Sequence, residues 1–359
     1  MVIADREDEV GMKVITIDGK DYRLPNGLNP FQQELYVHLI NWKWRNITKE
    51  PGTYAGIAYD VILPEVFQGE STWPHIYPDI AKELRRHRAK NDFRIHQHFY
   101  HMASSQTANI NLFLPVLLHR NASSILGTIK SDFASLATKY LDGGYCIEYW
   151  GGNSEDGGVG SGNTGPLNDK SQMSGTDSDI AIAYHNHEGE LCLWLIEHKL
   201  TEVEFTTCGG FRSNGRKERH DCSRSFSEIL KNKNTCYYHD VRKFNYWNIT
   251  ETNRDLFVNH AKHAKCPFQG GINQLWRNQL LALAVEQDER QLYQHASFSV
   301  VKHQNNTHLD RSLDEYRDLV SNNPRFSILT SADVLRAAES SGDTQLGHWV
   351  SWYKELYNL

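Results

Sequence analysis

The sequence predicts an α/β fold in which helices flank a mixed central sheet. Two apolar runs of strand length, residues 179–184 and 191–199, are separated by a polar turn that contains Gly, and this pattern predicts a hairpin. A strong apolar stripe over residues 274–286 predicts a buried helix downstream. The chain has 359 residues, including 9 Trp, 17 Tyr and 14 Phe, and this is enough to bury a large core.

Residues 1–95 are predicted to form a helical N-terminal extension packed on the core. Residues 14–19 resemble a strand and turn, and residues 28–46 have the pattern of an amphipathic helix. A further helix over residues 79–94 carries six Lys and Arg side chains. It could lie along phosphates or form a solvated surface helix, and the sequence leaves both interpretations open.

The core is predicted over residues 96–340, with a final helix in residues 341–359. Before the hairpin we expect helices over residues 101–118 and 132–141, and a strand over residues 143–150. Residues 151–176 are dense in Gly, Ser and Asn and predict a long loop. This loop contains a Gly-x-Gly-x-x-Gly match, but Pro166 follows it where a dinucleotide site needs a helix, so we exclude that function.

The second half of the core continues the alternation of helices and strands. After the helix at residues 274–286, the predicted elements are a strand at 295–302, a helix at 309–321, a strand at 326–330 and helices at 332–339 and 349–357.

Three charged residues are predicted to meet at one end of the hairpin. Side chains alternate along a strand, so Glu197 and Lys199 share a face. Asp179 begins the first strand, at the end that lies beside the finish of the second strand in an antiparallel pair. Two carboxylates and an amine in one place suit a divalent cation and an attacking water.

These residues resemble the signature of the PD-(D/E)xK nuclease superfamily, which has a restriction-endonuclease-like fold. Asp179 is followed, after a strand, by Glu197-x-Lys199, and Ser178 stands where the signature has Pro. The predicted order of helix, three strands, helix and strand is similar to the αβββαβ core of that fold. Ser-Ser-Gln106 with Asn-Leu-Phe in the first core helix, and Lys199-Leu-Thr-Glu, also resemble a group of bacterial restriction endonucleases.

The resemblance implies a metal-dependent nuclease that hydrolyses DNA. Asp179 and Glu197 would bind Mg²⁺ or Mn²⁺, and Lys199 would orient or deprotonate the attacking water. Gln274, at the start of its helix, matches a Gln that lies by the active site in related nucleases. Restriction or phage defence is the biological setting that the likeness implies.

Two residues are candidates for a third metal ligand. Many superfamily members have a Glu on the first core helix, and here Gln106 would have to substitute for it. Glu148 is the second candidate, and an edge or surface carboxylate is the simpler interpretation of this residue. Glu202 could belong to the outer shell of the metal, although a surface acid is the simpler expectation.

Residues 205–266 predict an insert that is bracketed by cysteines and locally basic. Between residues 205 and 245 there are nine Lys and Arg against four Asp and Glu, a net charge of about +5. Cys208, Cys222, Cys236 and Cys266 bracket this weakly hydrophobic segment, and four thiolates around Zn²⁺ or an iron–sulfur cluster could hold it together. No Cys-x-x-Cys occurs, so free reduced cysteines remain the alternative. Cys146 and Cys192 fall in predicted strands and are expected to be buried thiols.

The overall charge of −6 does not indicate a nucleic-acid-binding protein, so a DNA partner would be bound through local basic patches. No secretory signal or membrane span is apparent, and we expect a cytoplasmic protein with no membrane partner. The sequence leaves open whether the protein forms a homodimer.

The alternative functions are a catalytically inactive, nuclease-like DNA-binding module and an RNA-acting nuclease. A Ser-His-Asp hydrolase has no supporting motif, because Gly-x-Ser-x-Gly is absent from the sequence.

Overall fold

The computed structural model describes residues 11–69, 73–91, 93–152, 164–170, 175–213, 219–289 and 292–359. Its centre is a six-stranded mixed sheet in the order β10-β9-β8-β7-β5, in which β6 also pairs with β7. The six strands are β5 (Ser135–Leu136), β6 (Tyr145–Tyr149), β7 (Ser178–His185), β8 (Leu191–Lys199), β9 (His295–Lys302) and β10 (Phe326–Thr330).

The predicted hairpin is confirmed as the pair β7 and β8. The two strands are antiparallel, with Ile180 opposite Ile196 and His185 opposite Leu191. Strands β8, β9 and β10 run parallel to one another, whereas β5 and β6 are antiparallel to β7. The sheet is therefore mixed. The ends of β6, β8, β9 and β10 gather at one edge, together with the start of β7.

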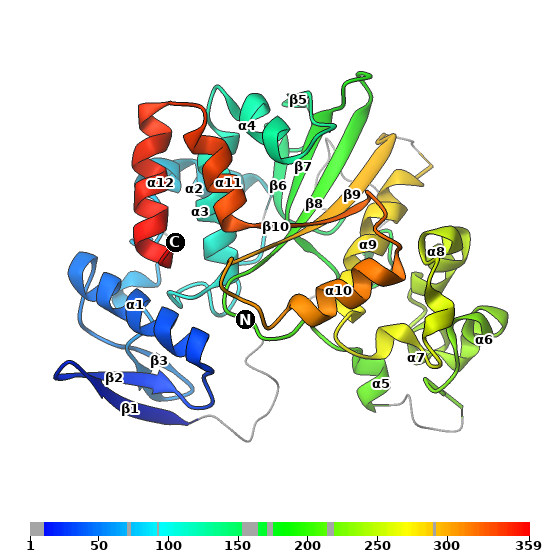
Figure 1. Cartoon of the computed structure of the whole chain (residues 1–359), viewed down its shortest axis with the longest axis horizontal. Coiled ribbons are helices and arrows are strands. Elements are labelled where there is room, and N and C mark those ends of the chain that lie inside the picture. Colours follow the sequence, from blue (N-terminus) through cyan, green and yellow to red (C-terminus); the bar gives the residue numbers. More distant parts are fainter. Residues whose placement is uncertain are drawn as a thin grey trace.

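Helices cover both faces of this sheet (Figure 1). The eight longer helices are α1 (Pro30–Asn46), α2 (Ala81–Asn91), α3 (Ser105–Leu117), α4 (Ala122–Ile129), α9 (Asn273–Glu286), α10 (Asp310–Leu319), α11 (Ser331–Glu339) and α12 (Thr344–Tyr357). Helices α3, α11 and α12 lie on one side, and α9 and α10 lie on the other. The prediction of a mixed sheet flanked by helices is confirmed.

Alternation along β8 divides the apolar interior into two cores. Cys192, Trp194 and Ile196 pack with α3, α11 and α12, whereas Leu193 and Leu195 pack with α9 and α10. Every residue of β8 is buried, as expected for a central strand that is covered on both faces. Glu197 and Lys199 continue the side that faces α9, and His198 continues the opposite side.

The N-terminal residues pack on the same core as α3 and α12. They form a hairpin of β1 (Met12–Ile17) and β2 (Lys20–Pro25), helix α1, and a short pair of β3 (Gly52–Tyr54) and β4 (Ile57–Tyr59). Helix α1 begins at Pro30, two residues after the start of the predicted range 28–46, because Asn29 Oδ1 accepts a hydrogen bond from the Gln32 backbone N–H at 2.9 Å.

The helix predicted over residues 132–141 is wrong. This stretch contains β5 and turns, and the helix lies earlier, at α4. Backbone N–H groups of Ala134 and Ala137 donate to carbonyls of His185 and Ala183 in β7, so pairing with the sheet edge outweighs local helical preference. Leu141 has a left-handed backbone (φ 54°), which ends any helical continuation before β6.

Four short helices lie between β8 and α9. They are α5 (Gly209–Ser213), α6 (Phe226–Lys231), α7 (Tyr237–Asp240) and α8 (Tyr246–Thr252), and they gather beside α9 and α10 (Figure 1). Residues 214–218 of this segment lie outside the described residues, as does most of the predicted loop at residues 151–176. Within the part of the chain that is described, no helix combines the length and apolar composition needed to cross a bilayer.

Candidate active site at one end of the central sheet

Charged side chains gather where β7 begins and β8 ends, on the face that packs against α9. Asp179 lies opposite Glu197, because the neighbouring residues Ile180 and Ile196 are paired in the antiparallel ladder. Lys199 Nζ is 2.8 Å from Glu197 Oε1, and both residues are 5% exposed. The structure thus brings together the three residues that the hairpin pattern pointed to.

Helix α9 fixes the Glu197 carboxylate from the other side. Gln274 Nε2 donates to Glu197 Oε1 at 2.7 Å, and Asn278 Nδ2 donates to Oε2 at 2.8 Å. The two amides are four residues apart on one helix face, so they reach one carboxylate together. Gln274 lies where the sequence prediction placed it. Asn278 was not among the predicted residues, although a polar residue one turn after Gln274 inside an apolar stripe was a usable signal.

Asp179 is held by the backbone of the neighbouring strand. Its Oδ2 accepts a hydrogen bond from the His198 backbone N–H at 2.6 Å. Burial and the negative charge of Glu197 raise the pKa of Asp179 well above its ordinary value, and they outweigh the opposing effects of Lys199 and of the hydrogen bond. The ionised form of Asp179 is therefore disfavoured unless positive charge is added nearby.

Lys199 keeps its charge in this setting. Burial alone would lower the pKa of Lys199, but the carboxylates of Glu197, Glu202 and Asp179 outweigh burial and raise the pKa above its ordinary value. Its positive charge partly offsets the negative charge of these three carboxylates.

Glu148 reaches the same end of the sheet from β6. It lies between Ile147 and Tyr149, which pair with β7 on either side of Asp179. Its backbone is left-handed (φ 54°), a conformation that costs on the order of 1 kcal/mol for a residue with a side chain. The alternation of side chains along β6 breaks at this residue. Tyr149 packs in the core beside α9, and the Glu148 side chain contacts Gln106 of α3 on the opposite face.

The side-chain amide of Gln106 forms hydrogen bonds through both its nitrogen and its oxygen. Its Nε2 donates to Glu148 Oε1 at 2.7 Å and to the Arg94 carbonyl at 3.0 Å. Its Oε1 accepts a hydrogen bond from the His96 backbone N–H at 3.0 Å. In this arrangement Gln106 positions Glu148, and its amide oxygen is already used.

Asp177 is a further acid near Glu148 that the sequence interpretation missed. Burial and the negative charges of Asp177 and Asp179 raise the pKa of Glu148 well above its ordinary value. Asp177 is also 3.0 Å from Lys170 Nζ. Its position two residues before Asp179, and so on the same side of an extended chain, was a signal that could have identified it.

Glu202 is not the surface acid that was expected. The residue is 3% exposed, and its Oε2 accepts hydrogen bonds from the backbone N–H groups of Leu200 and Thr201 at 2.8 and 3.0 Å. It therefore shapes the turn that follows Lys199.

Asp177, Asp179, Glu148 and Glu197 form an acidic cluster, and such a cluster suits a hard divalent cation. Burial and mutual repulsion raise the pKa of Asp179 and of Glu148, and such an ion would offset the repulsion. Among the described residues, no group of three or more His, Cys, Asp or Glu side chains is arranged so that it could hold one metal ion. Mg²⁺ commonly takes one or two protein carboxylates and completes its shell with water and substrate, so Asp179 and Glu197 together fit it.

The basic residues singled out in the sequence are partly neutralised in the structure. In the segment between β8 and α9, Arg219 is 2.8 Å from Asp240. In α2, both Arg86 and Lys90 contact Asp142, at 2.8 and 3.2 Å. A phosphate-binding surface would have to use the remaining basic side chains.

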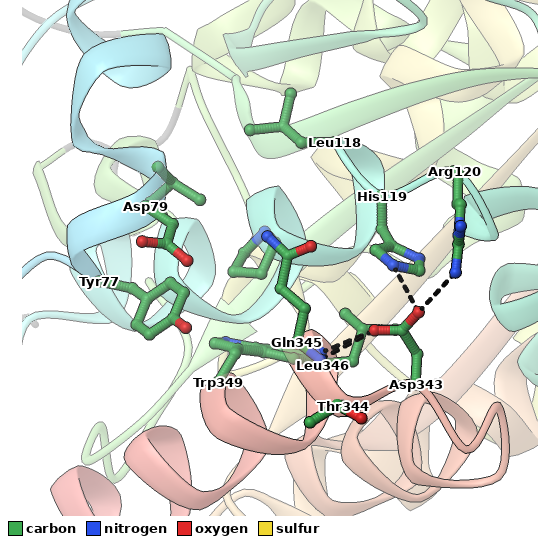
Figure 2. A pocket seen from close by; sticks show the side chains of 12 residues that line it. Tyr77, Asp79, Leu118, His119, Arg120, Asp343, Thr344, Gln345, Leu346 and Trp349 are labelled. Carbon is green, nitrogen blue, oxygen red and sulfur yellow. Dashed lines mark hydrogen bonds and ion pairs between the residues drawn. The ribbon is translucent and has the colours of Figure 1, made fainter.

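A separate hollow of about 550 Å³ lies between the start of α12 and the end of α3 (Figure 2). Figure 2 shows His119 and Arg120 directed at Asp343, with N···O distances of 3.3 and 3.2 Å. None of the acidic-cluster residues lines this hollow, so it is not part of the candidate active site.

The chain resembles a known protein family. No curated protein and no solved structure matches the chain. A model of the family described as "Restriction Endonuclease associating with ARP" matches residues 39–358. This range includes the whole central sheet, both helical layers and every residue of the acidic cluster. The chain therefore belongs to this family of restriction endonucleases.

Proposed function

We propose that this protein is a metal-dependent nuclease that hydrolyses DNA phosphodiester bonds. The observation that carries the proposal is the 2.8 Å contact between Lys199 Nζ and Glu197 Oε1 beside Asp179. Phosphodiester hydrolysis needs a divalent cation and positive charge next to the phosphate, and this arrangement can provide a site for both. Family membership supports the same class of reaction.

The order of elements supports the αβββαβ core of the PD-(D/E)xK fold. Helix α3 is followed, after α4 and the short strand β5, by β6, β7 and β8, and later by α9 and β9. In this interpretation the segment with α5 to α8 is the insert, and β10 extends the sheet beyond β9 (Figure 1).

Asp179 and Glu197 would hold Mg²⁺ or Mn²⁺, with Glu148 of β6 as a further acid at the same end of the sheet. When bound, such an ion lowers the pKa of a bound water and stabilises negative charge on the phosphate. Gln274 and Asn278 keep the Glu197 carboxylate in one orientation, and the His198 backbone N–H does the same for Asp179.

Lys199 would orient the attacking water and stabilise the phosphate. Because nearby carboxylates keep its ammonium group charged, donation of hydrogen bonds is favoured over removal of a proton. The water attacks phosphorus in line with the 3′ oxygen, the P–O3′ bond breaks, and the leaving oxygen takes up a proton. The products are a 3′-hydroxyl and a 5′-phosphate. We place this reaction in restriction or phage defence.

A second candidate is a DNA-binding module that does not cut. It is favoured by one observation: both carboxylate oxygens of Glu197 already accept hydrogen bonds from α9. This candidate predicts DNA binding that weakens with salt and no turnover with any divalent ion.

Purified protein can be tested on DNA and RNA in parallel, with Mg²⁺, Mn²⁺ or EDTA. We expect DNA cleavage only with a divalent ion, and loss of cleavage in Asp179→Asn and Glu197→Gln. Asp132→Asn is the matched control, because Asp132 accepts a hydrogen bond from Tyr184 at the opposite end of β7 and is expected to leave activity unchanged.

Each outcome of this assay separates the candidates. Cleavage of RNA alone identifies an RNA-acting nuclease. DNA binding without turnover identifies the inactive module. Equal cleavage by the wild type and both acid variants would contradict the assigned residues.

A further inference from the structure

Four chain segments that carry cysteines meet beside α8 and α9. Three backbone hydrogen bonds join these segments: Cys266 N–H to the Cys222 carbonyl (3.4 Å), Cys208 N–H to the Gln269 carbonyl (3.4 Å) and Asp221 N–H to the Thr235 carbonyl (3.1 Å). The segments are 14 to 30 residues apart along the chain, from residue 208 to residue 266. Local sequence does not bring them together, so the convergence is a property of the fold.

The side chains of the four cysteines, Cys208, Cys222, Cys236 and Cys266, lie near one another. In every pair among them, a charge on one thiol would raise the pKa of the other. None of the four forms a disulfide, and Cys208, Cys222 and Cys266 are buried. Each of the four side chains is therefore near the other three, as a ligand shared by all of them would require.

Backbone N–H groups point at three of these sulfur atoms. The Phe211 N–H donates to Cys208 Sγ at 3.4 Å. The Tyr238 and His239 N–H groups donate to Cys236, and the Phe268 N–H donates to Cys266. In each case the donor lies two or three residues after the cysteine. Such hydrogen bonds stabilise negative charge on sulfur, and charged sulfur is the form that binds metal.

The surroundings of the thiols are apolar and aromatic. Phe226 packs against Trp247 and Phe268, and Phe268 stacks on Trp276 with ring centroids 4.0 Å apart. The helices that carry or flank the cysteines have 4 to 7 residues each. Helices this short are not stable on their own, so a cross-link at their meeting point would stabilise the segment.

The four thiols suit a multinuclear centre better than a single ion. Within the described residues, no three of these side chains are arranged so that they could hold one metal ion. All four thiols are nevertheless close enough to one another for each to affect the pKa of the others. An iron–sulfur cluster separates its four ligands more widely than one Zn²⁺ does and is held by four Cys thiolates.

We propose that Cys208, Cys222, Cys236 and Cys266 bind an iron–sulfur cluster of the [4Fe–4S] class. The cluster joins the segment between β8 and α9 to the start of α9, the helix that carries Gln274 and Asn278. Assembly requires iron and sulfide from solution and deprotonation of the four thiols. It does not depend on the nuclease proposal.

The test uses the full chain purified without oxygen, with metal analysis, acid-labile sulfide analysis and a visible absorption spectrum. We expect about four iron and four sulfide per chain, with a broad visible absorption that bleaches on reduction. One zinc per chain and no iron would overturn the cluster, and the absence of both metals would overturn the site.

Substitution identifies the ligands. Cys236→Ser is expected to lose at least half of the iron, whereas Cys192→Ser is expected to retain it, because Cys192 is a buried thiol of β8 in the opposite core. Equal iron content in both variants would contradict the assignment. The wild-type metal content decides the question even if Cys236→Ser fails to fold. Metal content is also independent of DNA cleavage, so failure of either proposal can be recognised separately.

Discussion

Glu197 is oriented by three donors, and two of them are amides on one face of α9. Gln274 and Asn278 each bind a different carboxylate oxygen, while Lys199 shares Oε1 with Gln274. Groups that orient a metal-binding or catalytic side chain typically change activity or metal affinity by about ten- to a hundred-fold when they are removed. The structure therefore makes Asn278 a positioning residue for the proposed reaction.

The first prediction concerns this residue. Asn278→Ala removes the donor to Glu197 Oε2, so we expect the Mg²⁺ concentration for half-maximal cleavage to rise and the rate to fall by about ten- to a hundred-fold. A Mg²⁺ titration of the cleavage rate measures both effects.

The adjacent residue provides the control for that prediction. Gln279 is also a buried amide on α9, but its side chain has no hydrogen-bond partner among the described residues. Gln279→Leu is expected to leave cleavage unchanged and to keep or raise stability, because it removes a buried polar group that is unsatisfied. A loss of activity in Gln279→Leu equal to that in Asn278→Ala would mean that the effect comes from disturbed packing of α9.

At the scale of elements, side chains of α2 bind the carboxylate of Asp142, which lies just before β6. Asp142 accepts hydrogen bonds from Arg86 (2.8 Å), His87 (2.8 Å) and Lys90 (3.2 Å). His87 also accepts a hydrogen bond from the Ile147 backbone N–H of β6 at 3.2 Å. Burial lowers the pKa of His87 to about 4, so this imidazole links helix and strand in its neutral form.

The second prediction follows from that link. Burial alone would raise the pKa of Asp142, but the hydrogen bonds from Arg86 and Lys90 outweigh it and lower the pKa to about 2. A depressed pKa in the folded state stabilises the protein above the unfolded-state pKa of about 3.9, and this stabilisation is lost as pH falls toward 2. Asp142→Asn is therefore expected to reduce the free energy of unfolding by about 2 kcal/mol at neutral pH, and the difference from the wild type should shrink between pH 4 and 2.

Denaturant titrations at several pH values measure this difference. Asp314→Asn is the control, because Asp314 pairs with Arg317 on the exposed side of α10, and exposed pairs contribute about 0–1 kcal/mol. A difference for Asp142→Asn that stays constant down to pH 2 would contradict the role assigned to its charge.

Elements with a strong local pattern were predictable from the sequence. The bounds of β9 and β10 match the predicted residues 295–302 and 326–330, because each is a short apolar run between polar turns. The helix predicted over residues 132–141 failed because its backbone pairs with β7, a partner distant in the chain. Local propensity could not reveal that pairing.

At the scale of the whole molecule, the acidic end of the sheet lowers stability in the absence of a cation. Burial and like charge raise the pKa values of Asp179 and Glu148, so their ionised forms oppose folding at neutral pH. A divalent ion that binds only the folded protein would stabilise it by about 2.7 kcal/mol at a concentration of 100 times its Kd.

The third prediction is that Mg²⁺ raises the Tm of the wild-type protein and has little effect on Asp179→Asn. In EDTA, Asp179→Asn should be at least as stable as the wild type, because it removes one of the repelling charges. Thermal unfolding with MgCl2, and with NaCl at matched ionic strength, measures both effects. An equal Mg²⁺-dependent shift in the two proteins would contradict a cation site at Asp179.

The acids and the lysine of the candidate site were predictable because they belong to one hairpin with a short turn. Their supporting residues were not predictable to the same degree. Asn278 is 81 residues from Glu197, and the contact between Gln106 and Glu148 depends on a left-handed residue in β6. Such contacts arise from packing between elements, on which a single sequence gives little information.

The most direct test of the central claim is single-turnover DNA cleavage by Lys199→Met in Mg²⁺, with DNA affinity measured separately. We expect the cleavage rate to fall by at least about a hundred-fold, because a preorganised charge at the phosphate is lost, while the Kd for DNA changes little. Lys43→Met is the matched control: Lys43 is another buried lysine, but it donates to the backbone carbonyls of Asp60 and Ile62 near α1. It should lose stability and keep its cleavage rate below the unfolding temperature. Cleavage by Lys199→Met at the wild-type rate would contradict the account.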